Sequence, residues 1–214
     1  MKIVAVCSGG LDSTIMYYHL KSANHEVIPI NFNYGSKHNE MEREAGKRVL
    51  PGLRSFEIDL SFLHSSLLKG GVEIPHGHYQ AQNMRSTVVP FRNGIMLSYA
   101  VALAEDIEAD AVALGAHAGD HAIYPDCREE FLKAFDTTAQ AGTYQRIKLL
   151  APFWNFSKAE IVKRGAELGI LNEMAETWSC YEGGTSHCGK CGTCIERHEA
   201  FVLAGVDDQT TYQK

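Results

Sequence analysis

Short apolar runs and stretches with helical spacing follow one another along the chain. Apolar runs that end at glycine, proline or polar residues predict buried strands, and apolar positions three or four residues apart predict helices. The predicted strands are residues 2–7, Val27–Phe32, Phe56–Leu60, Ala109–Leu114 and Ile147–Ala151. The predicted helices are approximately Ser13–Leu20, His38–Leu50, Asn93–Ala104, Arg128–Ala141 and Ser157–Leu168.

The ends of the last helix are the most clearly marked. Ser157 can cap its N-terminus, Glu160 completes a capping box, and Gly169 ends it. By contrast, residues 69–86 are rich in glycine and show no clear period. Long segments of this kind inside a compact domain are usually functional, so a binding loop or lid is expected there.

The alternation of strands and helices predicts an α/β fold, with a doubly wound parallel sheet covered by helices on both faces. Ligands of such sheets bind beyond the carboxyl ends of the strands. A length of 214 residues suits one domain with a small appendage. We expect a sheet domain over residues 1–174 and a small cysteine-rich region over residues 175–214.

The composition limits the location and partners of the protein. No apolar run approaches the ~20 residues of a membrane span, and the short apolar N-terminus leads directly into a glycine turn, so a cytoplasmic protein is expected. The formal net charge of -6 argues against a direct grip on nucleic acid, because phosphate neutralisation dominates such binding. A small anionic ligand needs only a local positive site.

The loop Ser8–Ser13, with the sequence SGGLDS, joins the first predicted strand to the first predicted helix. Its glycines allow a tight turn that brings N–H groups close to a ligand, and the helix N-terminus adds positive potential. The hydroxyls of Ser8 and Ser13 can donate to phosphate oxygens, and Asp12 can orient the loop or help to hold Mg²⁺. The Walker and dinucleotide patterns both fail, because the required lysine and third glycine are absent. An ordinary Gly-Gly turn with an incidental helix cap is the alternative.

Four of the six cysteines crowd into the segment 180–194. Four thiolates form a closed tetrahedral shell for Zn²⁺, which indicates a structural metal site. An iron–sulfur cluster and redox-active disulfides are the alternatives. His187 lies inside the segment but is not needed to complete the shell, and Cys7 and Cys127 are expected to be buried. The candidate metal ligands are Cys180, Cys188, Cys191 and Cys194.

The SGGLDS loop resembles the pyrophosphate loop (PP-loop) of the N-type ATP pyrophosphatases, which adenylate carboxyl or carbonyl oxygens. This resemblance implies a Rossmann-like fold of the adenine nucleotide alpha hydrolase type, with Mg²⁺ and ATP as cofactors. Phe32 and Tyr34, at the end of the second predicted strand, are expected to border the adenine. The residues that the resemblance assigns to ATP are Ser8, Gly9, Gly10, Leu11, Asp12, Ser13, Thr14, Phe32 and Lys158.

The whole chain is similar to the 7-cyano-7-deazaguanine synthase (QueC) family. The similarity rests on SGGLDS, VPFRNG at 89–94, YPDCREEF at 124–131 and SCY…CGKCGTC at 179–194. It implies that 7-carboxy-7-deazaguanine, ammonia and ATP are converted to the nitrile through an adenylated carboxylate and an amide. It also implies a homodimer.

The same resemblance implies roles for individual residues, each with a plainer alternative. Asp12, Lys158 and Arg92 are expected to be catalytic, although Lys158 and Arg92 could be solvated surface residues. Asp126 could instead cap the following helix, and His117 and His121 could act as acid–base groups. The residues assigned to the deazaguanine acid are Arg92, Asn93, Asp120, Tyr124, Asp126 and Arg128.

Three other functions remain compatible with these motifs. A related enzyme could stop at the amide, or transfer the activated acid to another amine such as one on a partner protein. A nucleotide-binding module would bind ATP without substrate-dependent release of pyrophosphate. An RNA-thiolating enzyme is the third alternative, but the acidic charge and the closed four-thiol site argue against it.

Overall fold

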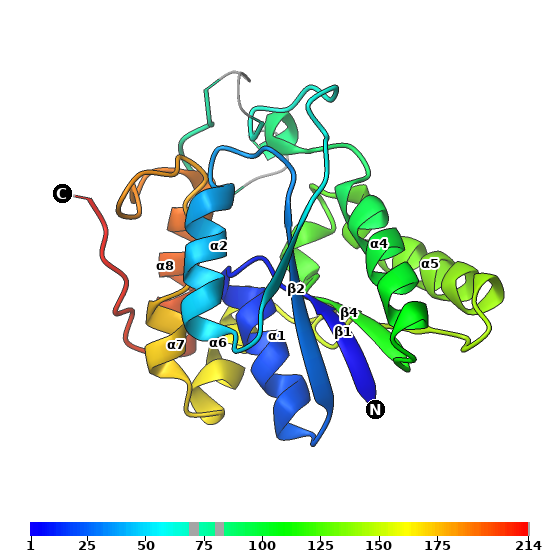
Figure 1. The fold of residues 1–214 in the computed structure, drawn as a ribbon. Coiled ribbons are helices and arrows are strands. Elements are labelled where there is room, and N and C mark those ends of the chain that lie inside the picture. Colours follow the sequence, from blue (N-terminus) through cyan, green and yellow to red (C-terminus); the bar gives the residue numbers. More distant parts are fainter. Residues whose placement is uncertain (69–72, 80–83, 214) are drawn as a thin grey trace.

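Figure 1 shows the protein as a computed structural model that describes residues 1–68, 73–79 and 84–213. Its centre is a sheet of five parallel strands in the order β3-β2-β1-β4-β5. The predicted α/β fold with a parallel sheet is confirmed. The strands are β1 (Lys2–Val6), β2 (Glu26–Asn33), β3 (Arg54–Glu57), β4 (Ala111–Leu114) and β5 (Lys148–Leu150).

Strand β1 lies in the middle of the sheet and is buried on both faces. Ile3 pairs with Val27 of β2 and with Ala111 of β4. Val4 packs into the core on one face of the sheet, and Ile3 packs into a separate core on the other face. This double burial explains why β1 is a continuous apolar run instead of an alternating one.

Helices cover both faces of the sheet (Figure 1). Helices α4 (Arg92–Asp106) and α5 (Glu129–Gly142) pack on one face, α4 against β1 and β4 and α5 against β5. Helix α1 (Leu11–Ser22) lies on the other face and packs against α6 and α7. The remaining helices are α2 (Asn39–Val49), α6 (Lys158–Glu167), α7 (Leu171–Ala175) and α8 (Gly192–Ala204), with 3₁₀ turns at Arg85–Thr87, Ala118–Asp120 and Pro125–Cys127.

The predicted third strand, Phe56–Leu60, is wrong in its position. Strand β3 ends at Glu57, and the last bond toward its neighbour runs from the Ile58 N–H to the Asn33 carbonyl at 2.8 Å. Strand β2 ends at Asn33, so later residues have no strand to pair with. Leu60 is buried although it lies beyond the strand, so the apolar pattern of the sequence continues past the last hydrogen bond of β3.

The predicted loop over residues 69–86 falls partly outside the described residues. Its described part includes Ile74, which is buried, and the start of the 3₁₀ turn at Arg85–Thr87.

The stretch Arg85–Asp106 is long and apolar enough to span a membrane by length and composition alone, but half of it is buried inside the protein. Because α4 packs on the sheet, we interpret this stretch as part of the core.

The C-terminal region packs tightly on the sheet domain through α8, which lies against α6. Arg197 of α8 is fully buried and donates hydrogen bonds to the Thr177 hydroxyl (2.8 Å), the Ser179 hydroxyl (3.0 Å) and the Met174 carbonyl (2.7 Å). Replacing Arg197 would leave these buried acceptors without their donor, which is costly. The region therefore forms part of the wall around the site described below.

Candidate functional site

The loop between β1 and α1 is shaped by close contact with α2. Gly9 has a φ of +93°, and a Cβ atom there would overlap the backbone of Glu42 and Gly46. Only glycine fits such a position. The loop is also tied internally, because the Gly10 N–H donates to the Ser8 hydroxyl (3.0 Å) and the Ser8 N–H donates to the Ser13 hydroxyl (3.2 Å).

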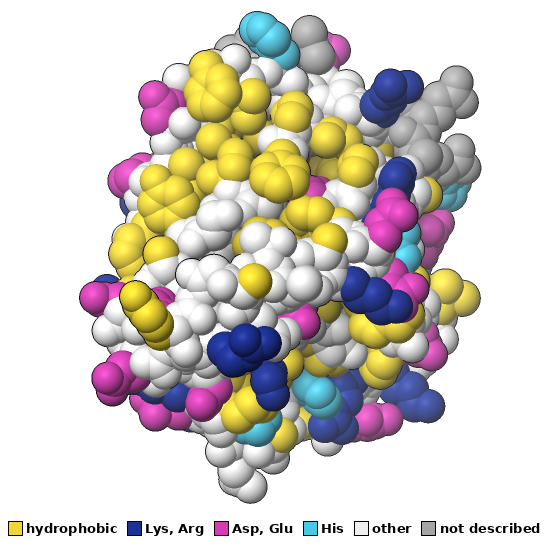
Figure 2. Space-filling model, turned by 90° about the vertical axis from the view of Figure 1, so that its right-hand side faces the viewer, with side chains coloured by type: hydrophobic (Ala, Val, Ile, Leu, Met, Phe, Trp, Pro, Cys, Tyr) yellow, Lys and Arg dark blue, Asp and Glu magenta, His cyan; other side chains and the backbone are white. Residues whose placement is uncertain are grey.

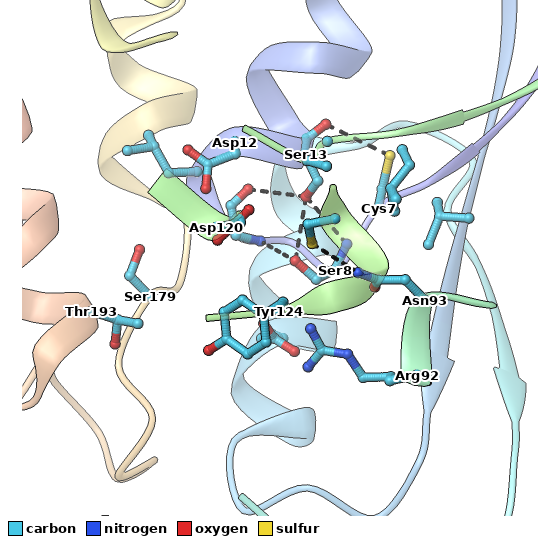
Figure 3. Close-up of a pocket in the computed structure, with 18 of the residues that line it drawn as sticks. Cys7, Ser8, Asp12, Ser13, Arg92, Asn93, Asp120, Tyr124, Ser179 and Thr193 are labelled. Carbon is cyan, nitrogen blue, oxygen red and sulfur yellow. Dashed lines mark hydrogen bonds between the residues drawn. The ribbon is translucent and has the colours of Figure 1, made fainter. Parts of the chain in front are cut away.

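This loop forms one side of a pocket at the carboxyl ends of β1, β2 and β4, as expected for a parallel sheet. Figure 3 shows Ser179 and Thr193 facing the pocket from the C-terminal region, with Arg92 and Asn93 on the other side. The pocket is lined by Ser8, Gly10, Leu11, Asp12 and Ser13, whereas Gly9 and Thr14 do not line it. Thr14 is instead fully buried in the core.

Lys158 is held between two carboxylates at the edge of the loop. Its ammonium lies 3.1 Å from Asp12 and 2.7 Å from Glu196 of α8. Burial would lower the pKa of Lys158, but Asp12, Glu196 and Asp120 outweigh it and raise that pKa above its usual value. Its side chain is only 13% exposed, so the alternative of a solvated lysine is wrong.

The two carboxylates respond differently to the shared lysine. Burial would raise the pKa of Asp12, but Lys158 and His117 outweigh it and lower that pKa. Burial raises the pKa of Glu196, and Lys158 only partly offsets it. Asp12 therefore stays ionised, and one of its oxygens, Oδ1, is buried without a hydrogen-bond partner among the described residues.

His117 completes this cluster, and His121 does not. The His117 Nε2 atom lies 3.8 Å from Asp12 and 3.6 Å from Asp120, and its Nδ1 atom accepts a hydrogen bond from the Gly119 N–H. A neutral His117 therefore carries its proton on Nε2, toward the carboxylates. The His121 ring stacks on Trp154 and does not line the pocket.

Arg92 lies across the pocket from Asp12, the partner of Lys158 (Figure 3). Its guanidinium donates to the Tyr34 hydroxyl at 3.0 Å and lies over the Tyr34 ring. Burial would lower the pKa of Arg92, but Tyr34, Tyr181 and further neighbours raise it above its usual value. The alternative of a surface arginine is wrong, because the charge points into the pocket.

Two residues assigned to the substrate take other places. Asp126 accepts a hydrogen bond from the Asn93 N–H (2.8 Å), so it holds the start of α4 and not the following helix. Asn93 itself lines the pocket. Arg128 donates to the His121 carbonyl (3.0 Å) and, like Asp126, does not line the pocket.

Other predicted residues do line the pocket. Asp120 accepts a hydrogen bond from the Tyr79 hydroxyl (3.2 Å), and the Tyr124 hydroxyl contacts that of Tyr181 (3.3 Å). Phe32 and Tyr34 lie at the end of β2, with Phe32 in the apolar part of the wall. Burial keeps Cys7 and Cys127 protonated by raising the pKa of both thiols, as expected for core residues.

Several pocket residues were not predicted from the sequence. They come from α2 and from the segments around the cysteines, and most have no motif of their own. The residues next to the cysteines could have been predicted from the sequence, because a cysteine that binds a metal also fixes the position of its neighbours in the chain. The unpredicted pocket residues are His38, Glu42, Tyr79, Trp178, Ser179, Tyr181 and Thr193. Glu196 was not predicted either; it does not line the pocket but contacts Lys158, which does.

The sulfur atoms of Cys180, Cys188, Cys191 and Cys194 all lie within 4.8 Å of one another. A tetrahedral site with metal–sulfur bonds of ~2.3 Å needs sulfur atoms about 3.8 Å apart, so the cluster fits one metal ion. The N–H groups of Lys190 and Cys191 point at the Cys188 sulfur, which favours a thiolate.

The cysteine cluster and the pocket share a wall. Ser179 and Tyr181 flank Cys180, and the Thr193 hydroxyl lies 3.3 Å from the Cys191 sulfur. His187 accepts a hydrogen bond from the Ser179 N–H and packs against Trp178, so it is not part of the sulfur cluster. A metal in the cluster would therefore fix one side of the pocket.

Comparison with known proteins identifies relatives over the full length of the chain. Residues 2–205 match the family described as "Queuosine biosynthesis protein QueC". The 7-cyano-7-deazaguanine synthase of Brucella anthropi is 45% identical over 221 residues, covering 100% of this chain and 94% of its own. The synthase of Allorhizobium ampelinum is 47% identical over 223 residues, covering 100% of this chain and 93% of its own.

A solved structure supports the fold independently. The predicted subunit of a tRNA methyltransferase from Methanocaldococcus jannaschii matches with a TM-score of 0.51 at 13% identity. The match covers 100% of this chain and 93% of that one. At this level of identity the similarity concerns the fold alone.

Proposed function

Because this chain belongs to the QueC family, we propose that it uses ATP and ammonia to convert 7-carboxy-7-deazaguanine to 7-cyano-7-deazaguanine. One observation carries the proposal: a single pocket joins the Ser8–Ser13 loop and Lys158 to Arg92 on the opposite wall. A carboxylate is a poor electrophile, and adenylation gives it a leaving group. Holding both reactants in one pocket supplies the proximity that this reaction needs.

The ATP end of the pocket is the loop side. The N–H groups at the start of α1 and the hydroxyls of Ser8 and Ser13 bind the pyrophosphate portion, and Lys158 neutralises its charge. Phe32 borders the adenine, and Leu114 and Met96 complete the apolar wall. Thr14 has no part in this proposal, since its side chain is in the core and its N–H donates to the Gly10 carbonyl.

The carboxylates around Lys158 are the proposed Mg²⁺ site. Asp12, Asp120 and Glu196 outnumber the single lysine, so a bare triphosphate would be repelled there. Mg²⁺ prefers carboxylate and phosphate oxygens, and the unpartnered oxygen of Asp12 offers a ligand. Asp12, Asp120 and Glu196 would hold the ion, which would offset the negative charge of the triphosphate.

The acid end of the pocket is the side of Arg92. We propose that its guanidinium binds the substrate carboxylate, with Asn93 and Tyr124 around the ring and Asp120 between the ring and the Mg²⁺ site. The carboxylate oxygen attacks the α-phosphorus, ammonia then displaces AMP to give the amide, and the amide oxygen is activated in its turn. Asp126 and Arg128 act from behind this wall, through α4 and the His121 segment.

The four cysteines are the proposed zinc ligands. A closed four-sulfur zinc site is structural, and here it would hold the Ser179–Tyr181 segment and Thr193 in place. The chemistry of the reaction does not pass through it. Its role is to keep the third wall of the pocket rigid.

We propose that two copies pair through the outer face of α4 and α5, in the cytoplasm. Figure 2 shows hydrophobic side chains gathered on this face. Phe91, which precedes α4, and Tyr99 of α4 are 59% and 51% exposed, and Phe91 contacts Phe131 of α5. An exposed apolar patch of this kind is typical of an interface, and a two-fold axis presents the same patch on both copies.

The proposed function is tested by identifying the product. The protein is incubated with 7-carboxy-7-deazaguanine, ATP, Mg²⁺ and ammonium, and the products are weighed by mass spectrometry. The nitrile is expected, with two ATP consumed for each product molecule. Accumulation of the amide alone, or pyrophosphate release without dependence on the acid, would contradict the proposal.

A further inference from the structure

The proposed reaction removes protons from nitrogen in both of its halves, so it needs a base. Ammonia loses a proton when it becomes the amide, and the activated amide loses its N–H protons when it becomes the nitrile. The residues assigned so far bind phosphate, carboxylate or metal, and none of them accepts these protons. This inference rests on the proposed function.

Glu42 of α2 is a buried carboxyl that lines the same pocket. Its side chain is 13% exposed. The backbone of Glu42 packs against Gly9 of the phosphate loop, and, against the effect of burial, Arg92 and Ser8 both lower the pKa of its carboxyl. Glu42 therefore lies beside the phosphate loop, in the pocket that we propose holds both reactants.

Glu42 differs from Asp12 and Glu196 because it has no positively charged ion-pair partner within the described residues. Asp12 and Glu196 share Lys158, whereas the only ion-pair contact of Glu42 within the described residues is His38, at 3.7 Å. Burial lowers the pKa of His38 to about 3, so this imidazole is neutral. Burial raises the pKa of Glu42 to about 8, with Arg92 and Ser8 opposing the shift.

The remaining titratable groups that face Glu42 do not supply a counter-charge within contact. Tyr34, at the end of β2, has its pKa raised by burial and is neutral. Arg92 of α4 makes its hydrogen bond to Tyr34. A carboxyl with a pKa near the working pH can accept and release protons and therefore suits general-base catalysis. A carboxylate held in an ion pair stays ionised and suits it less well.

Two other candidate bases fit less well. His117 directs its Nε2 atom toward Asp12 and Asp120, while its Nδ1 atom is occupied by the Gly119 N–H. His38 lines the pocket, but a group with so low a pKa binds protons weakly. Glu42 alone combines a position beside Ser8 with a suitable proton affinity.

We propose that Glu42 is the general base that removes protons from the nitrogen nucleophile and from the activated amide. In the first half, the ammonia lone pair forms the C–N bond, the C–O bond to AMP breaks with its electron pair on AMP, and one N–H proton moves to the Glu42 carboxylate. Glu42 then returns this proton to solvent.

In the second half, the amide oxygen carries AMP as its leaving group. Glu42 accepts the first N–H proton, which leaves a neutral O-adenylated imidate, and returns it to solvent. Glu42 then accepts the second N–H proton as the C–O bond breaks with its electron pair on AMP, and the nitrogen electrons complete the C≡N bond. AMP and the protons are the only other products, so the step needs no oxidant or reductant. One carboxyl thus serves both halves of the reaction.

The test compares Glu42→Gln with Glu40→Gln, a control on the exposed side of the same helix. The first measurement is the burst of pyrophosphate with ATP and 7-carboxy-7-deazaguanine in the absence of ammonia. The second is single-turnover formation of amide and nitrile with ammonium at pH 8. The third is trapping of the acyl adenylate by hydroxylamine. Hydroxylamine is unprotonated at this pH and a stronger nucleophile than ammonia, so its attack depends less on a general base.

Glu42→Gln is expected to keep the pyrophosphate burst within about 3-fold and to slow the ammonia-dependent step by about 10²–10⁴-fold. Hydroxylamine trapping should fall by a much smaller factor, and the rise of the rate with pH through about 8 should disappear. Glu40→Gln should match the unmodified protein in all three measurements.

An ammonia-dependent step within 3-fold of the unmodified protein would overturn the proposal. So would loss of the pyrophosphate burst in both Glu42→Gln and Glu42→Asp, because Glu42 would then serve adenylation or folding. If the unmodified protein itself gives no acid-dependent burst, the proposed function fails, whatever Glu42 does.

Discussion

The two ends of the pocket are built in different ways. The phosphate end is a continuous segment, Ser8–Ser13, and its shape follows from a strand, a glycine turn and a helix N-terminus. The acid end is assembled from β2, α2, α4 and the segment beside the cysteines. An end of the pocket formed by one segment of the chain depends little on how the rest of the fold is packed. An end formed by several elements depends on the position of each of them.

The ends also differ in their electrostatics. At the phosphate end, Lys158 lies in ion-pair contact with both Asp12 and Glu196. At the acid end, Glu42 and Arg92 are buried beside tyrosines and a neutral imidazole. Paired charges suit the binding of an anion and its metal, and a poorly matched carboxyl suits proton transfer.

Loss of the metal should have the largest effect on activity. It should first disorder the residues at the acid end of the pocket. Structural zinc sites contribute about 10–16 kcal/mol in small zinc-binding peptides, so Cys191→Ser should release the metal and abolish nitrile formation. The Ser179–Tyr181 wall should loosen, which fluorescence of the neighbouring Trp178 can report. Metal content by mass spectrometry is the direct check, with Cys127→Ser as the control thiol. Full activity without bound metal would contradict the shared-wall account.

Lys158→Met should damage the phosphate end alone. Loss of an electrostatic contact to the reacting phosphate usually costs about 10²–10³-fold in rate, and the release of Asp12 and Glu196 from their partner adds to the repulsion of ATP. Steady-state pyrophosphate release measures the effect. Lys163→Met, at an exposed position on the same helix, should be near neutral. Equal losses in the two variants would exclude a specific role for Lys158.

Arg92→Lys should affect the acid end without affecting ATP. A guanidinium binds a carboxylate through two parallel hydrogen bonds that a lysine cannot reproduce. Losing one charged hydrogen bond costs about 1.5–3 kcal/mol, so the KM for the acid should rise by about 10–100-fold. The KM for ATP should stay within about 2-fold. A matching rise in both would place Arg92 on the nucleotide instead.

Arg128→Ala gives the matched comparison, because the structure places Arg128 outside the pocket. Its contacts are the His121 carbonyl and the exposed Glu130. Substitutions at such sites usually change stability by no more than about 0.5 kcal/mol, so both KM values should be nearly unchanged. A selective rise in the KM for the acid would restore the role expected from the sequence.

The burial of Glu42 should also make the stability of the protein depend on pH. The folded-state pKa of Glu42 is raised from 4.5 to about 8, so the folded protein binds a proton that the unfolded chain releases above pH 4.5. Stability should therefore fall as the pH rises from about 4.5 to 8. Glu42→Gln should show a weaker fall, and thermal unfolding at several pH values measures it. Identical slopes in the two proteins would mean that Glu42 is not buried as described.

The comparison also explains what the sequence could predict. The parallel sheet, the Ser8–Ser13 loop and the cysteine cluster each follow from a contiguous pattern, and these features of the fold are confirmed. The end of β3 could not be predicted, because it is set by the end of β2 at Asn33 and not by its own apolar run.

The acid end was only partly predictable for the same physical reason. Asp126 and Arg128 lie in a motif-like segment, yet their side chains turn away to hold α4 and the His121 carbonyl. Glu42 and Glu196 lie in ordinary helical patterns. Glu42 lines the pocket and Glu196 contacts Lys158 only because α2 and α8 pack where they do. Tertiary packing decides which residues of a helix face a ligand.

The central claim is that Ser8–Ser13 holds the pyrophosphate while an acid oxygen attacks the α-phosphorus. Exchange of labelled pyrophosphate into ATP tests this step most directly, because it needs neither ammonia nor product. The account predicts exchange that depends on 7-carboxy-7-deazaguanine and that falls by about 10²-fold or more in Lys158→Met. Exchange without the acid, or no exchange at saturating ATP and acid, would contradict it.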